Sequence, residues 1–223
     1  MMNKKIFVAI DTKSISKAKK IIKSVKTNKL KIGYKFGLEF LNSKHGRSFV
    51  SKIKNKIIFA DLKLNDIPNT MISTVIALKD LKINYLSVHI SSGLEALKGV
   101  KKIAGKIKIV GVTTLTSLNN KDLKQIGHKR SIKNLVIHQS NLARKAKLDA
   151  LVCSAHEISQ VKKFFKKEII TPGIRFVGDK AKDQKRITTP KKAFEKGATS
   201  IVIGRSITKG NIKKNIQKLI KSL

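Results

Sequence analysis

Cysteine, acidic residues and aromatic residues are all scarce in this chain of 223 residues, and each scarcity excludes a class of protein. The single cysteine, Cys153, cannot form an internal disulfide bond, which is typical of proteins from a reducing compartment. It lies in the apolar run ALVCSA, where we interpret it as a small buried hydrophobic residue. No apolar run approaches the ~18 residues that a membrane-spanning helix needs, and the first apolar run is too short for a secretory signal. We therefore expect a soluble, cytoplasmic protein.

The shortage of acidic residues leaves a formal net charge of +37, from 50 basic and 13 acidic side chains. Such a charge raises the hypothesis of nucleic-acid binding. However, the lysines are spread along the whole chain, they greatly outnumber the arginines that read base edges, and aromatic residues are only 5% of the total. Compositional drift of an AT-rich genome explains the charge better. Binding to nucleic acid is expected to be nonspecific at most.

Several catalytic and cofactor motifs are also missing from the sequence. It contains no phosphate-binding P-loop, no Cys/His cluster with zinc spacing and no G-x-S-x-G nucleophile motif. The five histidines are scattered, and we interpret His89, at the end of an apolar run, as a structural residue. Nothing in the sequence requires a metal ion or an organic cofactor.

What the sequence does contain is a regular alternation of strand-like and helix-like segments. The apolar runs are nearly continuous and of strand length, as expected for parallel strands that are covered on both faces. Between them lie segments with helical periodicity, such as 68–81, which begins at Pro68, and 190–197, with Thr189 as N-cap, Pro190 at the first position and Gly197 after the end. The strand signals lie at 6–10, 30–34, 57–63, 85–90, 108–115, 150–155, 169–175 and 200–205.

Eight such repeats predict a (β/α)₈ TIM barrel of the α/β class, with residues 1–223 as a single domain. A doubly wound open sheet is the alternative, but no G-x-G-x-x-G follows the first strand. The longest interval between strands, 116–149, is expected to hold an extra helix or a long loop.

In a barrel of this kind the chemistry belongs at the C-terminal ends of the strands. Asp61 and Lys63 are two residues apart on one predicted strand, so both side chains share a face. If that face is the inner one, a carboxylate and an ammonium lie in contact at the barrel mouth; a salt bridge without catalytic function fits this pair equally well. The candidates at predicted strand ends are Asp11, Lys31, Asp61, Lys63, Asp66, His89, Thr116, Arg175 and Arg205.

The last two predicted strands end in TPGIR and VIGR, where barrels often bind phosphate. Gly173 and Gly204 permit a close approach of the backbone to an anion, and Arg175 and Arg205 supply forked donors that suit phosphate oxygens. The polar segment 176–186 between these strands is compatible with a mobile lid and with an ordinary flexible loop.

These segments together resemble the orotidine 5′-phosphate decarboxylase family along almost the whole chain. The longest matching motif is DLKLNDIPNT. The shorter motifs occur along the chain in the order of the family, and they are LKIG, GVTTLTS, VCSA, TPGIR, DQKRITTP and VIGR. Two positions depart from the pattern: Ser92 stands where a second glycine is common, and Ser206 stands where proline is usual. Ser206 is expected to loosen the turn beside Arg205.

The resemblance implies decarboxylation of orotidine 5′-monophosphate (OMP) to UMP without a cofactor, by a homodimer with shared active sites. Lys63 would donate the proton to C6, Asp61 would lie against the substrate carboxylate, and Asp66 would enter the site of the neighbouring subunit. The catalytic residues implied are Lys31, Asp61, Lys63 and Asp66. The substrate-binding residues implied are Asp11, Lys31, Asp61, Leu62, Lys63, Leu64, Asn65, Asp66, Ile67, Pro68, Asn69, Thr70, Thr116, Arg175, Gln184, Gly204 and Arg205.

Two alternatives stay open at this point. A metal-dependent sugar-phosphate decarboxylase on the same barrel shares an Asp-x-Lys-x-x-Asp pattern but needs further acidic ligands, which the sequence does not obviously supply. A basic nucleic-acid-binding protein is the alternative from a different class, and it requires basic residues gathered on one face.

Overall fold

The structure, a computed structural model, describes residues 4–179 and 186–223. Within these ranges eight parallel strands form a closed barrel in which each strand pairs with the next along the chain and β8 pairs with β1. The predicted TIM barrel is therefore confirmed, and each predicted strand corresponds to an observed one. The strands are β1 (Lys5–Ile10), β2 (Lys31–Gly37), β3 (Ile57–Leu64), β4 (Tyr85–His89), β5 (Lys108–Val112), β6 (Ala150–Val152), β7 (Glu168–Thr171) and β8 (Ser200–Ile203).

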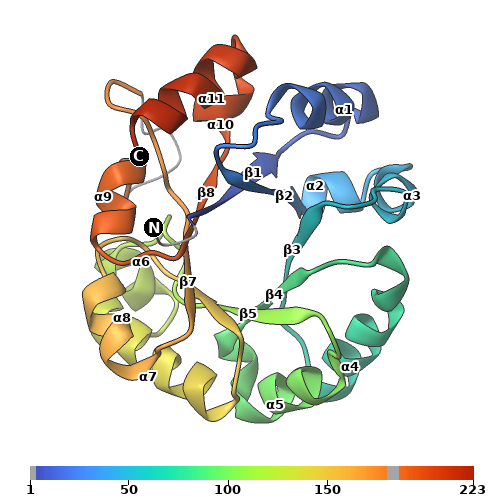
Figure 1. The fold of residues 1–223 in the computed structure, drawn as a ribbon. Helices are drawn as coiled ribbons and strands as arrows, with labels where there is room; N and C mark the ends of the chain where they lie inside the picture. Colours follow the sequence, from blue (N-terminus) through green and yellow to red (C-terminus); the bar gives the residue numbers. More distant parts are fainter. Residues whose placement is uncertain (1–3, 180–185) are drawn as a thin grey trace.

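Helices form a ring outside the strands (Figure 1). The interval 116–149 holds two of them, α6 and α7, so the expected extra helix is present. The helices are α1 (Ile15–Ser24), α2 (Leu38–Leu41), α3 (Gly46–Ser51), α4 (Pro68–Ala77), α5 (Gly93–Ile103), α6 (Asn120–Gln125), α7 (Ile132–Lys145), α8 (Ile158–Phe164), α9 (Pro190–Glu195), α10 (Arg205–Thr208) and α11 (Ile212–Lys221). Two 3₁₀ turns, η1 (Lys79–Leu81) and η2 (Ile90–Ser92), precede and follow β4.

The helix starts follow the capping rules that the sequence indicates. The Thr189 side chain accepts a hydrogen bond from the backbone N–H of Lys192, and Pro190 is the first residue of α9. Pro68 likewise begins α4. Gly197 ends the α9 segment with a φ of +102°, a conformation that side chains with a Cβ rarely adopt.

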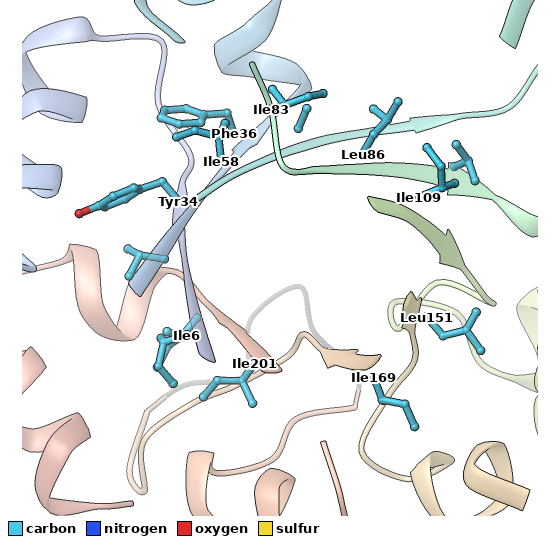
Figure 2. Packing of buried hydrophobic residues seen from close by; sticks show 14 of the residues in the cluster. Ile6, Tyr34, Phe36, Ile58, Ile83, Leu86, Ile109, Leu151, Ile169 and Ile201 are labelled. Atoms are coloured by element: carbon cyan, nitrogen blue, oxygen red, sulfur yellow. The ribbon is translucent and has the colours of Figure 1, made fainter. Parts of the chain in front are cut away.

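Alternate residues of each strand face the helices and form the main hydrophobic core. Figure 2 shows such residues of β1 to β8, among them Ile6, Tyr34, Ile58 and Leu151, pointing away from the barrel axis. The intervening residues face inward and form a smaller cluster in the barrel centre around Phe7. This two-sided burial explains why the strands read as continuous apolar runs.

A buried polar network occupies the N-terminal end of the barrel interior. The Glu168 carboxylate accepts hydrogen bonds from Lys5 Nζ at 2.8 Å, from the Ser200 hydroxyl at 2.7 Å and from the Tyr85 hydroxyl at 3.0 Å. Because both carboxylate oxygens are bound in this way, Glu168 is fixed at the bottom of the barrel. In TIM barrels the functional residues lie at the opposite, C-terminal end.

No helix in the two described ranges is long and apolar enough to cross a membrane. Cys153 is buried, 1% exposed, as predicted, and this burial raises the pKa of its thiol. It is therefore a packing residue rather than a reactive thiol.

Candidate active site

The C-terminal mouth of the barrel contains a cavity of about 570 Å³. Its walls come from the ends of several strands and the loops after them, as is typical of TIM-barrel active sites. The lining combines acidic and basic side chains with Thr116 and the two arginines of the predicted phosphate end. The lining residues that concern the candidate site are Asp11, Lys35, Asp61, Lys63, Thr116, Arg175, Gly204 and Arg205.

Four side chains of alternating sign, Asp11, Lys35, Asp61 and Lys63, form what we call the charged array. Lys35 Nζ lies 3.1 Å from Asp61 Oδ2 and 3.6 Å from Asp11 Oδ1. Lys63 Nζ lies 2.9 Å from the same Asp61 oxygen. Asp61 is therefore held between two ammonium groups, and the predicted inward contact of Asp61 with Lys63 is confirmed.

The charges of the array sustain one another. Burial by itself raises the pKa of Asp61, but the ammonium groups of Lys35 and Lys63 outweigh it and lower that pKa to about 2. Burial lowers the pKa of Lys35, and the carboxylates of Asp61 and Asp11 more than offset this, so that it lies above its ordinary value. Asp61 and Lys35 therefore both stay ionised at neutral pH.

Ser87, on β4, orients the two residues that carry the motif. Its hydroxyl donates to Asp61 Oδ1 at 2.9 Å and accepts the backbone N–H of Lys63, also at 2.9 Å. Lys63 has a φ of +50°, and the register between β3 and β4 shifts between Ala60 and Leu64. A left-handed conformation is unusual for lysine and clusters at functional sites. It ends the regular strand while Lys63 still faces the cavity.

Lys31 was predicted as a catalytic and substrate-binding residue, and the structure contradicts this prediction. Lys31 is the exposed first residue of β2 and pairs with Lys5, at the opposite end of the barrel from Asp61. Lys35 lies four residues further along the same strand and belongs to the charged array instead. Since β2 continues to Gly37, three residues beyond the predicted run 30–34, the inward lysine at the C-terminal end is Lys35.

The structure places the loop after β3 outside this cavity. Leu62 and Leu64 are half-buried and pack against the main core. Pro68 is half-buried at the start of α4, and none of the residues from Asn65 to Thr70 lines the cavity. Asn65, Asp66, Ile67, Asn69 and Thr70 are exposed.

The predicted phosphate residues do gather at one end of the cavity. Arg175, Gly204 and Arg205 line it together, on the loop after β7 and at the junction of β8 and α10. Gly173 precedes Arg175 with a φ of +74°, which explains why glycine stands at this turn. Gln184, the remaining predicted substrate-binding residue, lies outside the described residues.

Two polar residues outside the array bear on the site. His89 is half-buried at the end of β4, where burial and the Lys63 ammonium lower its pKa. The Ser206 hydroxyl, at the position where proline was expected, donates to the Asp179 carboxylate and so adds a contact beside Arg205. In the described part of the chain no three His, Cys, Asp or Glu side chains gather as a metal-binding group.

Residues 4–218 match the family model described as "Orotidine 5'-phosphate decarboxylase / HUMPS family". The chain belongs to this family. It is 45% identical over 222 residues to the orotidine 5′-phosphate decarboxylase of Wolbachia sp. subsp. Brugia malayi (strain TRS), with 96% of each chain covered. It is 43% identical over 226 residues to the enzyme of Wolbachia pipientis subsp. Culex pipiens (strain wPip), with 98% of each covered.

A solved structure of the family has the same fold. The crystal structure of orotidine 5′-phosphate decarboxylase from Lactobacillus acidophilus is 28% identical to the chain and superposes with a TM-score of 0.83, covering 97% of each chain. The family therefore extends over the whole barrel, including both the charged array and the phosphate end.

Proposed function

We propose that the chain decarboxylates orotidine 5′-monophosphate to UMP, with the charged array as the reaction centre and Lys63 as the proton donor. The chain is a carboxy-lyase of pyrimidine biosynthesis, as follows from its family and from its relatives at 45% and 43% identity, which are named orotidine 5′-phosphate decarboxylase. The observation that carries the detailed proposal is the 2.9 Å contact of Lys63 with an ionised Asp61 at the barrel mouth.

The reaction needs a site that stabilises negative charge at one carbon. When the bond from C6 to the carboxylate breaks, CO₂ leaves and the electron pair stays on C6. The Lys63 ammonium stabilises that charge and then transfers a proton to C6, after which solvent restores the proton on Lys63. Asp61 and Lys35 hold the ammonium in place beforehand, so that the charges need little reorganisation in the transition state.

The substrate is anionic at both ends, and the protein suits it. Arg175 and Arg205 bind the phosphate through charge-assisted hydrogen bonds, while Asp11 contacts the ribose and Thr116 the pyrimidine. Binding energy from the remote phosphate is expressed at C6 by fixing the ring in the cavity. The net charge of +37 further favours the approach of an anionic nucleotide.

A purified sample treated with EDTA tests the function against the metal-dependent alternative. We expect full consumption of OMP, because the Asp61 carboxylate is bound by two lysines. The consumption is measured as the loss of OMP absorbance. The same sample with added Mg²⁺ serves as the control. Turnover that disappears in EDTA and returns with Mg²⁺ would contradict the proposal and favour the metal-dependent alternative.

We further propose a homodimer, located in the cytoplasm, whose active sites each receive Asp66 from the neighbouring subunit. The proposal is supported by the position of Asp66, which is exposed and does not line its own cavity. Three large apolar side chains in this region of the barrel, Leu38, Ile67 and Ile76, are 51%, 66% and 54% exposed. A second copy packed on this face would cover them and bring Asp66 to its cavity.

Mixing two inactive variants tests the shared site. Lys63→Ala and Asp66→Asn each remove one member of every site in their own homodimers, so both are expected to be inactive. In a mixed dimer one of the two sites contains intact Lys63 and Asp66. After subunit exchange at equal amounts we expect recovery of about one quarter of the wild-type activity, since about half of the dimers are mixed. No recovery in a mixture shown to contain mixed dimers would exclude a shared site.

A further inference from the structure

A buried ion pair between Arg186 and Glu157 lies outside the charged array and has no part in the mechanism above. Arg186 Nη1 donates to Glu157 Oε1, and the two side chains are 14% and 9% exposed. Arg186 Nη2 also donates to the backbone carbonyl of Leu115, at 3.5 Å. The pair therefore connects the loops that follow β5, β6 and β7.

Stability alone does not explain this pair. In the described part of the chain Glu157 Oε2 and Arg186 Nε are buried without a hydrogen-bond partner. A buried ion pair with unsatisfied atoms contributes little net stability, because the cost of removing both charges from water offsets their attraction. Burial accordingly raises the pKa of Glu157 although the Arg186 guanidinium opposes the shift.

The pair lies beside the backbone that carries the phosphate end. Two residues after Arg186, Thr188 forms an isolated parallel bridge with Ile174. The N–H of Thr188 donates to the Gly173 carbonyl at 3.1 Å, and the Thr188 carbonyl accepts the N–H of Arg175 at 2.9 Å. The segment that begins at Arg186 thus holds the main chain from Gly173 to Arg175 by two hydrogen bonds, one at each of these residues.

We infer that the Arg186–Glu157 pair is a positioning element that sets the phosphate end of the cavity by fixing the segment paired with Arg175. Glu157 provides a firm anchor, because its backbone N–H donates to Ser154 at 3.1 Å and its carbonyl caps α8 through Val161 at 2.9 Å. The contact with Leu115 is longer, so its effect on the pyrimidine end is secondary. This inference rests on the proposed function, since it concerns the binding of a phosphorylated substrate.

The test compares OMP with orotidine, which lacks the phosphate. In Arg186→Ala we expect kcat/KM for OMP to fall about 10- to 100-fold, mostly through KM, because a small displacement of a substrate-positioning residue has effects of this size. The value for orotidine should change much less. Arg186→Lys keeps the ion pair and should recover most of the loss.

A second variant separates positioning from folding. Glu157→Leu combined with Arg186→Met replaces the pair with apolar groups, which typically leaves a protein equally stable or more so. We expect an unchanged or higher Tm. We also expect the same fall in kcat/KM for OMP as in Arg186→Ala, with much less change for orotidine. Arg47→Ala is the matched control, since it removes an arginine that contacts Asp80 at 2.7 Å on the exposed surface, and it should leave both substrates unaffected.

The outcomes are distinguishable. An equal loss for both substrates, or no loss in folded Arg186→Ala and in the folded double variant, would overturn the inference while the proposed function stands. If the wild-type chain does not turn over OMP, the proposed function and this inference fail together.

Discussion

Lys63→Ala is expected to lower turnover of OMP by at least about four orders of magnitude, because both charge stabilisation and proton donation at C6 are lost. The barrel should still fold, since Asp61 keeps its ion pair with Lys35 at 3.1 Å and its hydrogen bond from Ser87. The measurement is the steady-state rate with OMP, with circular dichroism and thermal unfolding as the control for folding.

Lys63→Arg distinguishes the two roles of this residue. A guanidinium keeps the positive charge beside Asp61 but does not give up its proton at neutral pH. We therefore expect Lys63→Arg to stay far below the wild-type rate. A rate near that of the wild type in either variant would contradict Lys63 as the proton donor.

The second large effect is expected from substitution of Lys35, with substitution of Lys31 as its control. Lys35→Ala removes an ammonium whose side chain is only 12% exposed and which lies between Asp61 and Asp11. We expect turnover to fall on the order of 10²- to 10³-fold and Tm to decrease, because Asp61 then has a single cationic partner in a buried site. Steady-state kinetics and thermal unfolding measure both effects.

Lys31→Ala is the matched control from the same strand. Lys31 is exposed at the N-terminal end of β2, so its removal should leave the kinetics unchanged. A large loss in Lys31→Ala, or full activity in Lys35→Ala, would mean that the charged array is assigned to the wrong lysine.

The prediction of Lys31, where the structure has Lys35 in the charged array, shows where reasoning from the sequence reached its limit. Lys31, Gly33 and Lys35 alternate on the inner face of β2, so the pattern contained the correct residue. The predicted run 30–34 contains Lys31 and stops at Tyr34, one residue before Lys35, and the resemblance to the family implies a catalytic role for Lys31. The observed strand continues through Phe36 to Gly37, three residues beyond the predicted run, and the inward lysine at its C-terminal end is Lys35, four residues after Lys31.

The barrel itself was predictable because parallel strands that are buried on both faces leave a strong local signal. The contact of Asp61 with Lys63 followed from the two-residue period of a strand. The left-handed conformation of Lys63 and the support from Ser87 did not, because both depend on the register of β3 against β4.

Contacts between distant loops were beyond the reach of local patterns. Glu157 and Arg186 are 29 residues apart; Glu157 lies two residues after the VCSA motif, Arg186 lies within DQKRITTP, and neither motif indicates a role for these side chains. The parallel pairing of β6 with β7 brings the loops after these strands together. For Asp66, the sequence likewise predicted only that the residue lies beyond the strand, and not that its side chain is exposed.

The central claim is that this cavity converts OMP to UMP and CO₂ without a metal ion. The most direct measurement is the release of labelled CO₂ from OMP that carries the label in its carboxylate, with the purified chain in EDTA. We predict that one CO₂ is released for each UMP formed and that Lys63→Ala releases none above background. Folded wild-type protein that releases no CO₂ from OMP would contradict the account.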